Sequence, residues 1–198
     1  MSDPNTIRVY DARAGEYAQI TGSDTPDAAL QAFIDALPSG AQVLDLGCGP
    51  GAAAGNMARA GHMVQAWDAS HEMVALAARH PGVRAAHKEF DDLAQLAPES
   101  LDGVWANFSL LHADAADMPG HLSAIKSALR PGGLFHIAVK EGHGTHRDPI
   151  GRFYTYYMVE SLSDLLRAEG LEPGPFRKGR DRGLDGRVAP WISTTAHA

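Results

Sequence analysis

The chain has 198 residues, of which 44% are hydrophobic and 21% are charged, proportions typical of a single globular domain. Its 17 basic and 24 acidic side chains give a formal net charge of −7, which disfavours non-specific binding to nucleic acid. The single cysteine, Cys48, excludes a disulfide within the chain and a cysteine-based zinc site. Residues 1–11 lack a signal-peptide pattern, and no apolar run is long enough to span a membrane. We therefore expect a cytoplasmic monomer or homodimer with no membrane partner.

Short β-rich runs alternate with helical segments through the middle of the chain. The patterns predict helices near 11–20 and over 27–37, 52–60, 72–79 and 121–129. They predict strands over 41–46, 63–67, 83–87, 101–106 and 134–139, so that strands and helices largely alternate from residue 41 onward. A polar loop over 140–152, a helix over 159–168 and one or two edge strands within 171–195 follow. This alternation predicts a doubly wound, mostly parallel, seven-stranded α/β sheet with right-handed crossovers.

A glycine-rich turn connects the first predicted strand to the next helix. Gly47, Gly49 and Gly51 permit positive φ and leave room for a ligand beside the backbone. Asp68, at the end of the next strand, is placed to accept hydrogen bonds from both hydroxyls of a ribose. The spacing also satisfies a dinucleotide fingerprint, so an NAD(P)-linked reductase is one alternative. Asp45 argues against it, because a carboxylate here would repel a pyrophosphate and attract a cationic ligand.

Four segments in order resemble the motifs of class I S-adenosylmethionine-dependent methyltransferases. They are Asp45-x-Gly47-x-Gly49-x-Gly51, then Trp67-Asp68-Ala69-Ser70 with Met73, then Leu101 to Asn107 with Leu110-Leu111-His112, and finally Leu129 to Phe135. The resemblance covers residues 41–140. It implies a Rossmann-like methyltransferase fold, S-adenosylmethionine as the cofactor and no metal.

The same resemblance implies roles for individual residues. The three glycines and Asp45 would line the methionine part of the cofactor, and Asp68 would bind the ribose. Ser70 and Met73 would lie beside the adenine, and Asn107 would contribute its backbone near the methionine ammonium. Phe90 and Asp91 are candidates for the adenine amine, although the family's commoner Gly-Asp pair is missing there. Asp91 and Asp92 would alternatively cap the next helical turn.

The segment after the fifth strand is rich in Arg and Tyr. It contains Lys140-Glu141-Gly142, Gly151-Arg152-Phe153-Tyr154 and an ending from Asp181-Arg182 to Trp191. This pattern resembles a bacterial subgroup of small methyltransferases, described as tellurite-resistance-like or methyltransferase type 11–12. It resembles more faintly the tRNA wobble-uridine carboxymethyl methyltransferases. Either these side chains form a wall that binds an anionic acceptor, or the arginines pair with Asp148, Asp181 and Asp185 and hold the tail on the sheet. The residues of the proposed wall are Arg147, Arg152, Tyr154, Tyr157 and Arg182.

Three further candidates lie outside the glycine turn and the tail. His112 is the best candidate for a substrate contact or a general base, and its alternative is a packed histidine. Tyr10 and Tyr17 share one predicted helical face and would belong to a lid, or only to the packing of an amphipathic helix. We therefore expect a single domain over 1–198, with a helical lid over 1–38, a cofactor-binding core over 41–140 and a substrate-side tail over 141–198.

These patterns leave three functions open. The first is S-adenosylmethionine-dependent methyl transfer to a small molecule, which the arginines would bind if it is anionic. The second is methylation of a tRNA wobble uridine, which the acidic balance disfavours. The third is a nucleotide-binding module without catalysis, or an NAD(P)-linked reductase. His143 and His146 lie among glycines with no third ligand nearby, so they predict a loop rather than a metal site.

Overall fold

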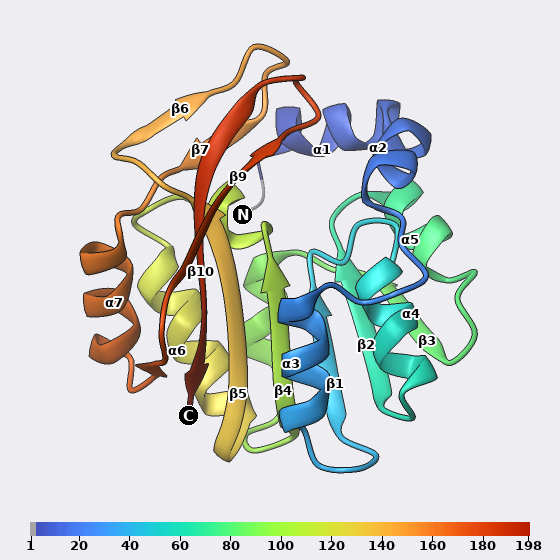
Figure 1. Cartoon of the computed structure of the whole chain (residues 1–198), viewed down its shortest axis with the longest axis vertical. Coiled ribbons are helices and arrows are strands. Elements are labelled where there is room, and N and C mark those ends of the chain that lie inside the picture. The colour runs from blue at the N-terminus through green and yellow to red at the C-terminus, as the bar shows by residue number, and fades with distance from the viewer. Residues whose placement is uncertain (1–2) are drawn as a thin grey trace.

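The computed structural model describes residues 3–198 and has an eight-stranded sheet at its centre (Figure 1). The strand order is β3-β2-β1-β4-β5-β10-β8, and β9 pairs with the outer part of β10. The first five strands are parallel, and β10 runs antiparallel to β5. The strands of this sheet are β1 (Gln42–Leu46), β2 (Met63–Asp68), β3 (Val83–His87), β4 (Leu101–Asn107), β5 (Leu129–Lys140), β8 (Glu172–Pro173), β9 (Arg177–Arg182) and β10 (Val188–His197).

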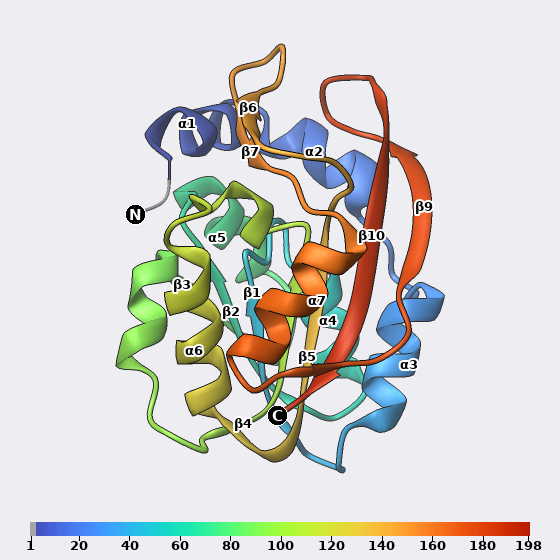
Figure 2. The same ribbon diagram turned by 90° about the vertical axis from the view of Figure 1, so that its left-hand side faces the viewer.

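Helices cover both faces of the sheet, and Figure 2 shows α3 and α6 on opposite sides of it. On one face, buried side chains of α3, α4 and α5 pack on β1 and β2. On the other face, η1, α6 and α7 pack on β4 and β5. The helices are α1 (Pro4–Ala12), α2 (Ala14–Thr21), α3 (Ala28–Ala36), α4 (Ala52–Arg59), α5 (His71–Ala77), η1 (Phe90–Gln95), η2 (Leu110–His112), α6 (Met118–Ala128) and α7 (Val159–Ala168).

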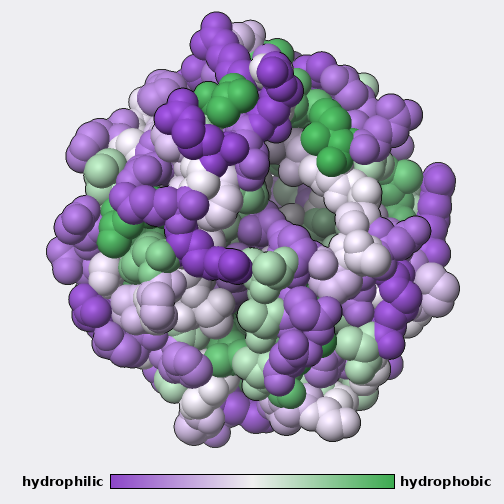
Figure 3. Space-filling model, viewed as in Figure 1, coloured by the Kyte–Doolittle hydropathy of each residue, from purple (hydrophilic) through white to green (hydrophobic). Residues whose placement is uncertain are grey.

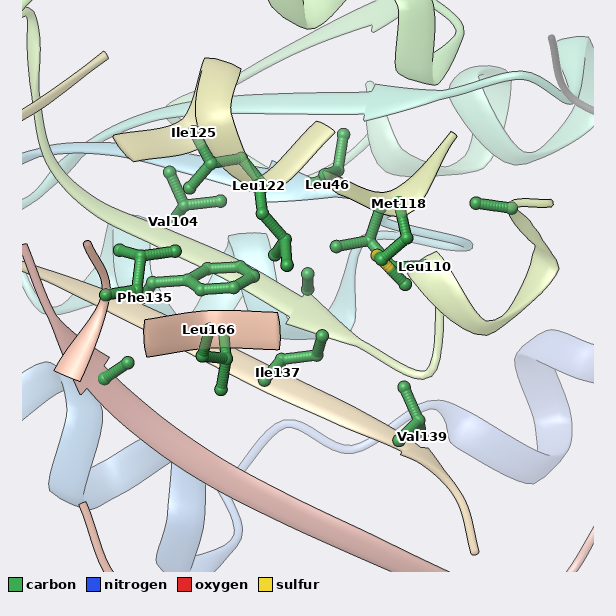
Figure 4. Packing of buried hydrophobic residues seen from close by; sticks show 14 of the residues in the cluster. Leu46, Val104, Leu110, Met118, Leu122, Ile125, Phe135, Ile137, Val139 and Leu166 are labelled. Atoms are coloured by element: carbon green, nitrogen blue, oxygen red, sulfur yellow. The ribbon is translucent and has the colours of Figure 1, made fainter. Parts of the chain in front are cut away.

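The larger hydrophobic cluster lies between the sheet and α6 and α7. Figure 4 shows Met118, Leu122 and Ile125 of α6 facing the sheet, with Leu166 of α7 close to Ile137. Strands buried on both faces need near-continuous apolar runs, as β5 has from Leu134 to Val139. This packing fixes the carboxyl ends of the parallel strands, where the candidate site lies.

The expected fold class is confirmed, while several boundaries differ from the prediction. The helix expected near 11–20 is two short helices, α1 and α2, because the backbone leaves the helical region at Arg13. The sheet has eight strands rather than seven, since the tail forms β8, β9 and β10. The loop expected over 140–152 includes β6 (Thr145–Arg147), which forms a hairpin with β7 (Phe153–Thr155). No helix within residues 3–198 is long and apolar enough to cross a membrane.

Strand β5 begins earlier than the expected residue 134, because residues 129–133 belong to the strand. β5 begins at Leu129, which pairs with Leu101, and the register shifts before Gly103 pairs with Leu134. Gly132 donates to the carbonyl of Ala198, and Ala198 donates to the carbonyl of Gly133. The C-terminal residue therefore satisfies the backbone groups at this irregular start of the strand.

Candidate active site

A hollow lies at the carboxyl ends of the parallel strands, under α1 and α2, and Figure 3 shows it opening on this face of the molecule. It consists of two adjoining compartments with a shared wall. The Asp68 compartment, named for Asp68 at the end of β2, encloses about 680 Å³ including its mouth. The Arg152 compartment, named for Arg152 before β7, is wider and encloses about 1370 Å³. Residues that line both compartments are Tyr10, Tyr17, Gly47, Gly49, Asn107 and Phe108.

The glycine turn is held close to the neighbouring strands. The N–H groups of Gly47 and Cys48 donate to the carbonyl of Trp67 at 2.7 and 2.9 Å. Gly47 has φ of 68°, and a Cβ there would lie 2.3 Å from Cβ of Ser109. Gly51 has φ of 84° and is the N-cap of α4. Backbone conformation and close packing thus both require glycine at these positions.

Two carboxyl groups flank the turn. Asp45 lines the Arg152 compartment, and its Oδ2 is buried without a hydrogen-bond partner among the described residues. Burial raises the pKa of Asp45 to about 7, while a backbone hydrogen bond from Ala54 acts in the opposite direction and lowers it. Asp68 accepts from the N–H groups of Gly49 and Ser70 at 2.8 and 2.9 Å, and burial also raises its pKa. Such a site favours a ligand that brings a positive charge and hydroxyl donors, and it would repel a pyrophosphate.

Most residues expected beside an adenine line the Asp68 compartment. Ser70, Met73 and Phe90 are there together, and Ser70 caps α5 by accepting from the N–H of Met73 at 3.1 Å. Asp91 does not line the compartment. The neighbouring Asp92 caps η1, where it accepts from the N–H of Glu89 at 2.9 Å.

Helices α1 and α2, which lie within the predicted lid over 1–38, line the hollow, and α1 is attached to the β6–β7 hairpin. Tyr10 and Tyr17 contact each other edge to face, with ring centroids 5.3 Å apart. Asp3, the N-cap of α1, accepts from both Nη atoms of Arg147 at 2.9 and 2.7 Å. These hydrogen bonds hold the pKa of Asp3 well below its usual range. The hydroxyl of Thr6 accepts from the N–H of Phe153 at 2.8 Å, which adds a second attachment.

A chain of hydrogen bonds links His112, Tyr10 and Arg152. Nδ1 of His112 lies 2.6 Å from the carbonyl oxygen of Phe153, which can only accept, so this nitrogen is protonated. Burial lowers the pKa of His112 to about 4, so the imidazole is neutral near pH 7. Nε2 therefore accepts from the hydroxyl of Tyr10 at 2.9 Å, and that hydroxyl accepts from Nη1 of Arg152 at 3.0 Å.

The predicted tail residues separate into three locations. Arg152, Tyr154 and Arg182 line the Arg152 compartment. Arg147 lies outside both compartments and holds the lid, and Tyr157 packs in the hydrophobic core. The structure does not place Arg147 and Tyr157 where they could contact a ligand in the hollow.

The alternative ion pairs of the tail form only in part. Arg152 pairs with Asp148 at 2.8 Å, and both side chains are buried. Asp181 instead accepts from Nε1 of Trp191 at 2.6 Å, while Arg182 donates to the carbonyl of Gly186. The sequence therefore predicted one of these pairs correctly, and the arginine of that pair lines the Arg152 compartment.

Phe108, Lys140 and Trp191 also line the hollow, although the sequence did not predict them as site residues and Lys140 and Trp191 stood out only as parts of the tail pattern. Phe108 has φ of 58°, which is uncommon for a residue other than glycine, and no sequence pattern predicts it. Lys140 ends β5 at the same edge as the glycine turn, so its position was accessible from the strand pattern. Among residues 3–198 no group of three potential ligands could hold a metal, and His146 stacks on Tyr156.

Comparisons with known proteins agree with this geometry. Residues 43–133 match the family model of a methyltransferase domain. The ubiquinone biosynthesis O-methyltransferase of Xanthomonas axonopodis pv. citri is 38% identical over 106 residues, which are 51% of this chain and 44% of that protein. The same enzyme of Xanthomonas campestris pv. campestris is 36% identical over 108 residues. The chain thus spans less than half the length of the curated relatives it matches.

Solved structures of methyltransferases share the whole fold. The Burkholderia thailandensis 1,6-didemethyltoxoflavin-N1-methyltransferase, solved with its acceptor and S-adenosylhomocysteine, has a TM-score of 0.74 and 25% identity, covering 98% of this chain and 87% of that one. A methyltransferase of Methanosarcina mazei has a TM-score of 0.74 and 18% identity over 87% of this chain and 97% of its own, which shows the fold alone. Together these matches support an S-adenosylmethionine-dependent methyltransferase with S-adenosylmethionine as its cofactor.

Proposed function

We propose that the protein transfers a methyl group from S-adenosylmethionine to a small acceptor that binds in the Arg152 compartment. The observation that supports this most strongly is the pair of carboxyl groups on either side of the glycine turn, the buried Asp45 and the half-buried Asp68. A sulfonium and an ammonium are attracted to such a site, whereas the pyrophosphate of a dinucleotide is repelled. The carboxyl groups therefore favour methyl transfer over NAD(P)-linked reduction.

The residues around the turn fit this cofactor. Asp68 would accept from the ribose hydroxyls, and the unpartnered Oδ2 of Asp45 would face the positively charged methionine end. Ser70, Met73 and Phe90 would contact the adenine. S-adenosylmethionine supplies an electrophilic methyl group on a sulfonium, whose charge disappears as the methyl leaves. The lid would exclude water from the hollow, which strengthens these electrostatic contacts.

His112 fits a positioning role better than that of a general base. Its low pKa makes it a weak base, and Nε2 already accepts from Tyr10. We infer that His112 and Arg152 together fix the hydroxyl of Tyr10 in the wall shared by the compartments. An acceptor that is already deprotonated needs no base, so orientation and desolvation would supply most of the rate enhancement.

Calorimetry tests the cofactor assignment. S-adenosylmethionine and S-adenosylhomocysteine should bind with micromolar affinity, as is ordinary for enzyme ligands, and NADH should not bind detectably. Binding of NADH without binding of S-adenosylhomocysteine would establish the reductase alternative and overturn the proposal. A methylation assay on bulk tRNA tests the wobble-uridine alternative, and we expect no transfer because of the net charge of −7.

Other expectations from the sequence stay predictions. We propose a single methyltransferase domain in the cytoplasm, a monomer or homodimer, within the tellurite-resistance-like subgroup. Its tail supplies Arg152, Tyr154 and Arg182 to the acceptor side of the hollow. Light scattering during gel filtration would measure the oligomeric state.

A further inference from the structure

Lys140 is a half-buried lysine at the carboxyl end of β5, and it lines the Arg152 compartment. No ion pair or hydrogen bond of its ammonium group exists within residues 3–198. Two other lysines are paired with carboxylates: Nζ of Lys88 lies 3.3 Å from Asp92, and Nζ of Lys178 lies 2.6 Å from Glu141. An ammonium group that is partly removed from water loses hydration, and here no hydrogen bond or ion pair within the described residues replaces it, although Asp185 attracts it from nearby.

A second cation lies close to Lys140. A Cβ built at Gly183 would lie 3.7 Å from Nζ of Lys140 and 3.9 Å from Nη2 of Arg152. Both nitrogens therefore border the same small space beside a residue that has no side chain. Arg152 binds Asp148 through Nε and Nη2 and Tyr10 through Nη1, and its guanidinium has N–H donors left after these contacts.

The nearby carboxylates do not neutralise this pair completely. Asp148 is bound by Arg152, and Asp181 accepts from Nε1 of Trp191. Asp185 is the carboxylate nearest to this space, since its Oδ1 would lie 3.0 Å from the Cβ built at Gly183. The same oxygen accepts from the N–H of Arg187 at 3.2 Å. The ammonium of Lys140 thus keeps its hydrogen-bonding capacity for something else in the compartment.

We propose that Lys140 and Arg152 form an oxyanion-binding site beside Gly183, and that the methyl acceptor carries a carboxylate or another oxyanion there. The identification of the bound anion as part of the methyl acceptor rests on the proposed function, while the anion site itself rests only on the geometry. Arginine presents a planar fork and lysine a point charge, a combination suited to an anionic oxygen pair. Arg152 also holds Tyr10, which lines both compartments, so an anion bound here lies beside the shared wall.

Calorimetry with a defined probe tests the site. S-adenosylhomocysteine is titrated first, and sodium benzoate or inorganic phosphate is then titrated into that complex. Lys140→Met removes the charge with little change of shape, and we expect it to weaken benzoate binding about tenfold or more, because a charge-assisted hydrogen bond is lost. Lys140→Arg keeps the charge and should restore binding to within about threefold. Comparing the affinity for phosphate with that for benzoate shows whether the site prefers a tetrahedral oxyanion or a carboxylate.

Two further variants separate a binding role from a structural one. Gly183→Ala places a methyl group between the two cations without removing either charge, and it should also weaken benzoate binding. Lys178→Met removes a lysine of β9 that lines neither compartment, so it should leave benzoate binding unchanged. Thermal unfolding shows whether each variant is folded.

The outcomes distinguish the two proposals. The anion site is overturned if Lys140→Met binds benzoate and phosphate as tightly as the wild type does. It is also overturned if the wild type binds neither anion. Failure of S-adenosylhomocysteine to bind, with benzoate binding still dependent on Lys140, overturns the proposed function and leaves the anion site standing. Weaker benzoate binding in Lys140→Met and Gly183→Ala, with cofactor affinity unchanged, supports both.

Discussion

The two compartments of the hollow are built in different ways. The Asp68 compartment takes Gly47, Gly49, Asp68 and Ser70 from the turns after β1 and β2, and it takes further polar side chains from α1, α2 and the segment after β4. The Arg152 compartment combines the lid, the end of β5, the segment before β7 and the β9–β10 hairpin, which lie far apart in the sequence. The glycine turn lines both compartments, whereas the residues after β5 line only the Arg152 compartment. We therefore expect substitutions of the carboxyl groups beside the glycine turn, Asp68 and Asp45, to change cofactor affinity, and substitutions of Lys140 and Arg152 to change acceptor binding.

The largest effect should come from Asp68→Ala. We propose that its carboxylate accepts from both ribose hydroxyls, and it also accepts from the N–H of Gly49 in the glycine turn. Hydrogen bonds to a charged group contribute about 1.5–3 kcal/mol each, so the affinity for S-adenosylhomocysteine should fall about 100-fold or more. Calorimetry measures it. Benzoate binding to the Arg152 compartment should persist, and its simultaneous loss would contradict the independence of the compartments.

The affinity for S-adenosylmethionine should depend on pH through Asp45. Burial raises the pKa of Asp45 from 3.8 to about 7 in the free protein. The carboxyl group is therefore mostly neutral below pH 7 and mostly ionised above it. A cationic ligand needs the ionised form, so affinity should rise with pH, about tenfold between pH 6 and pH 8. Dissociation constants measured across this range test the expectation.

Asp45→Asn is the matched control for this pH dependence. The amide has nearly the same shape but does not titrate, so the variant should bind the cofactor weakly at both pH values. A rise of affinity with pH that survives in Asp45→Asn would assign the effect to Asp68 instead, whose pKa burial also raises.

The same contrast between compartments explains what the sequence could predict. Gly47, Gly49 and Asp68 were identifiable because each follows a strand with an alternating or apolar pattern, and parallel strands end at one edge of a sheet. The partners of Arg147 and Tyr10 were not identifiable. They depend on how α1 packs against a hairpin more than a hundred positions away, and no local periodicity encodes that contact.

The smallest effect, and the sharpest test of the shared wall, should come from Tyr10→Phe. The substitution removes only the hydroxyl between Arg152 and His112, and it leaves Nε2 of His112 without its donor. An unsatisfied buried acceptor costs about 1–3 kcal/mol, part of which would appear as reduced kcat with S-adenosylmethionine affinity nearly unchanged. Tyr17→Phe is the matched control, because Tyr17 lines the same wall but takes no part in this hydrogen-bond chain. We therefore expect Tyr10→Phe to lower kcat several-fold more than Tyr17→Phe does in an assay of S-adenosylhomocysteine release. Equal effects would show that the tyrosines act only by packing, and that the hydroxyl of Tyr10 does not position the acceptor.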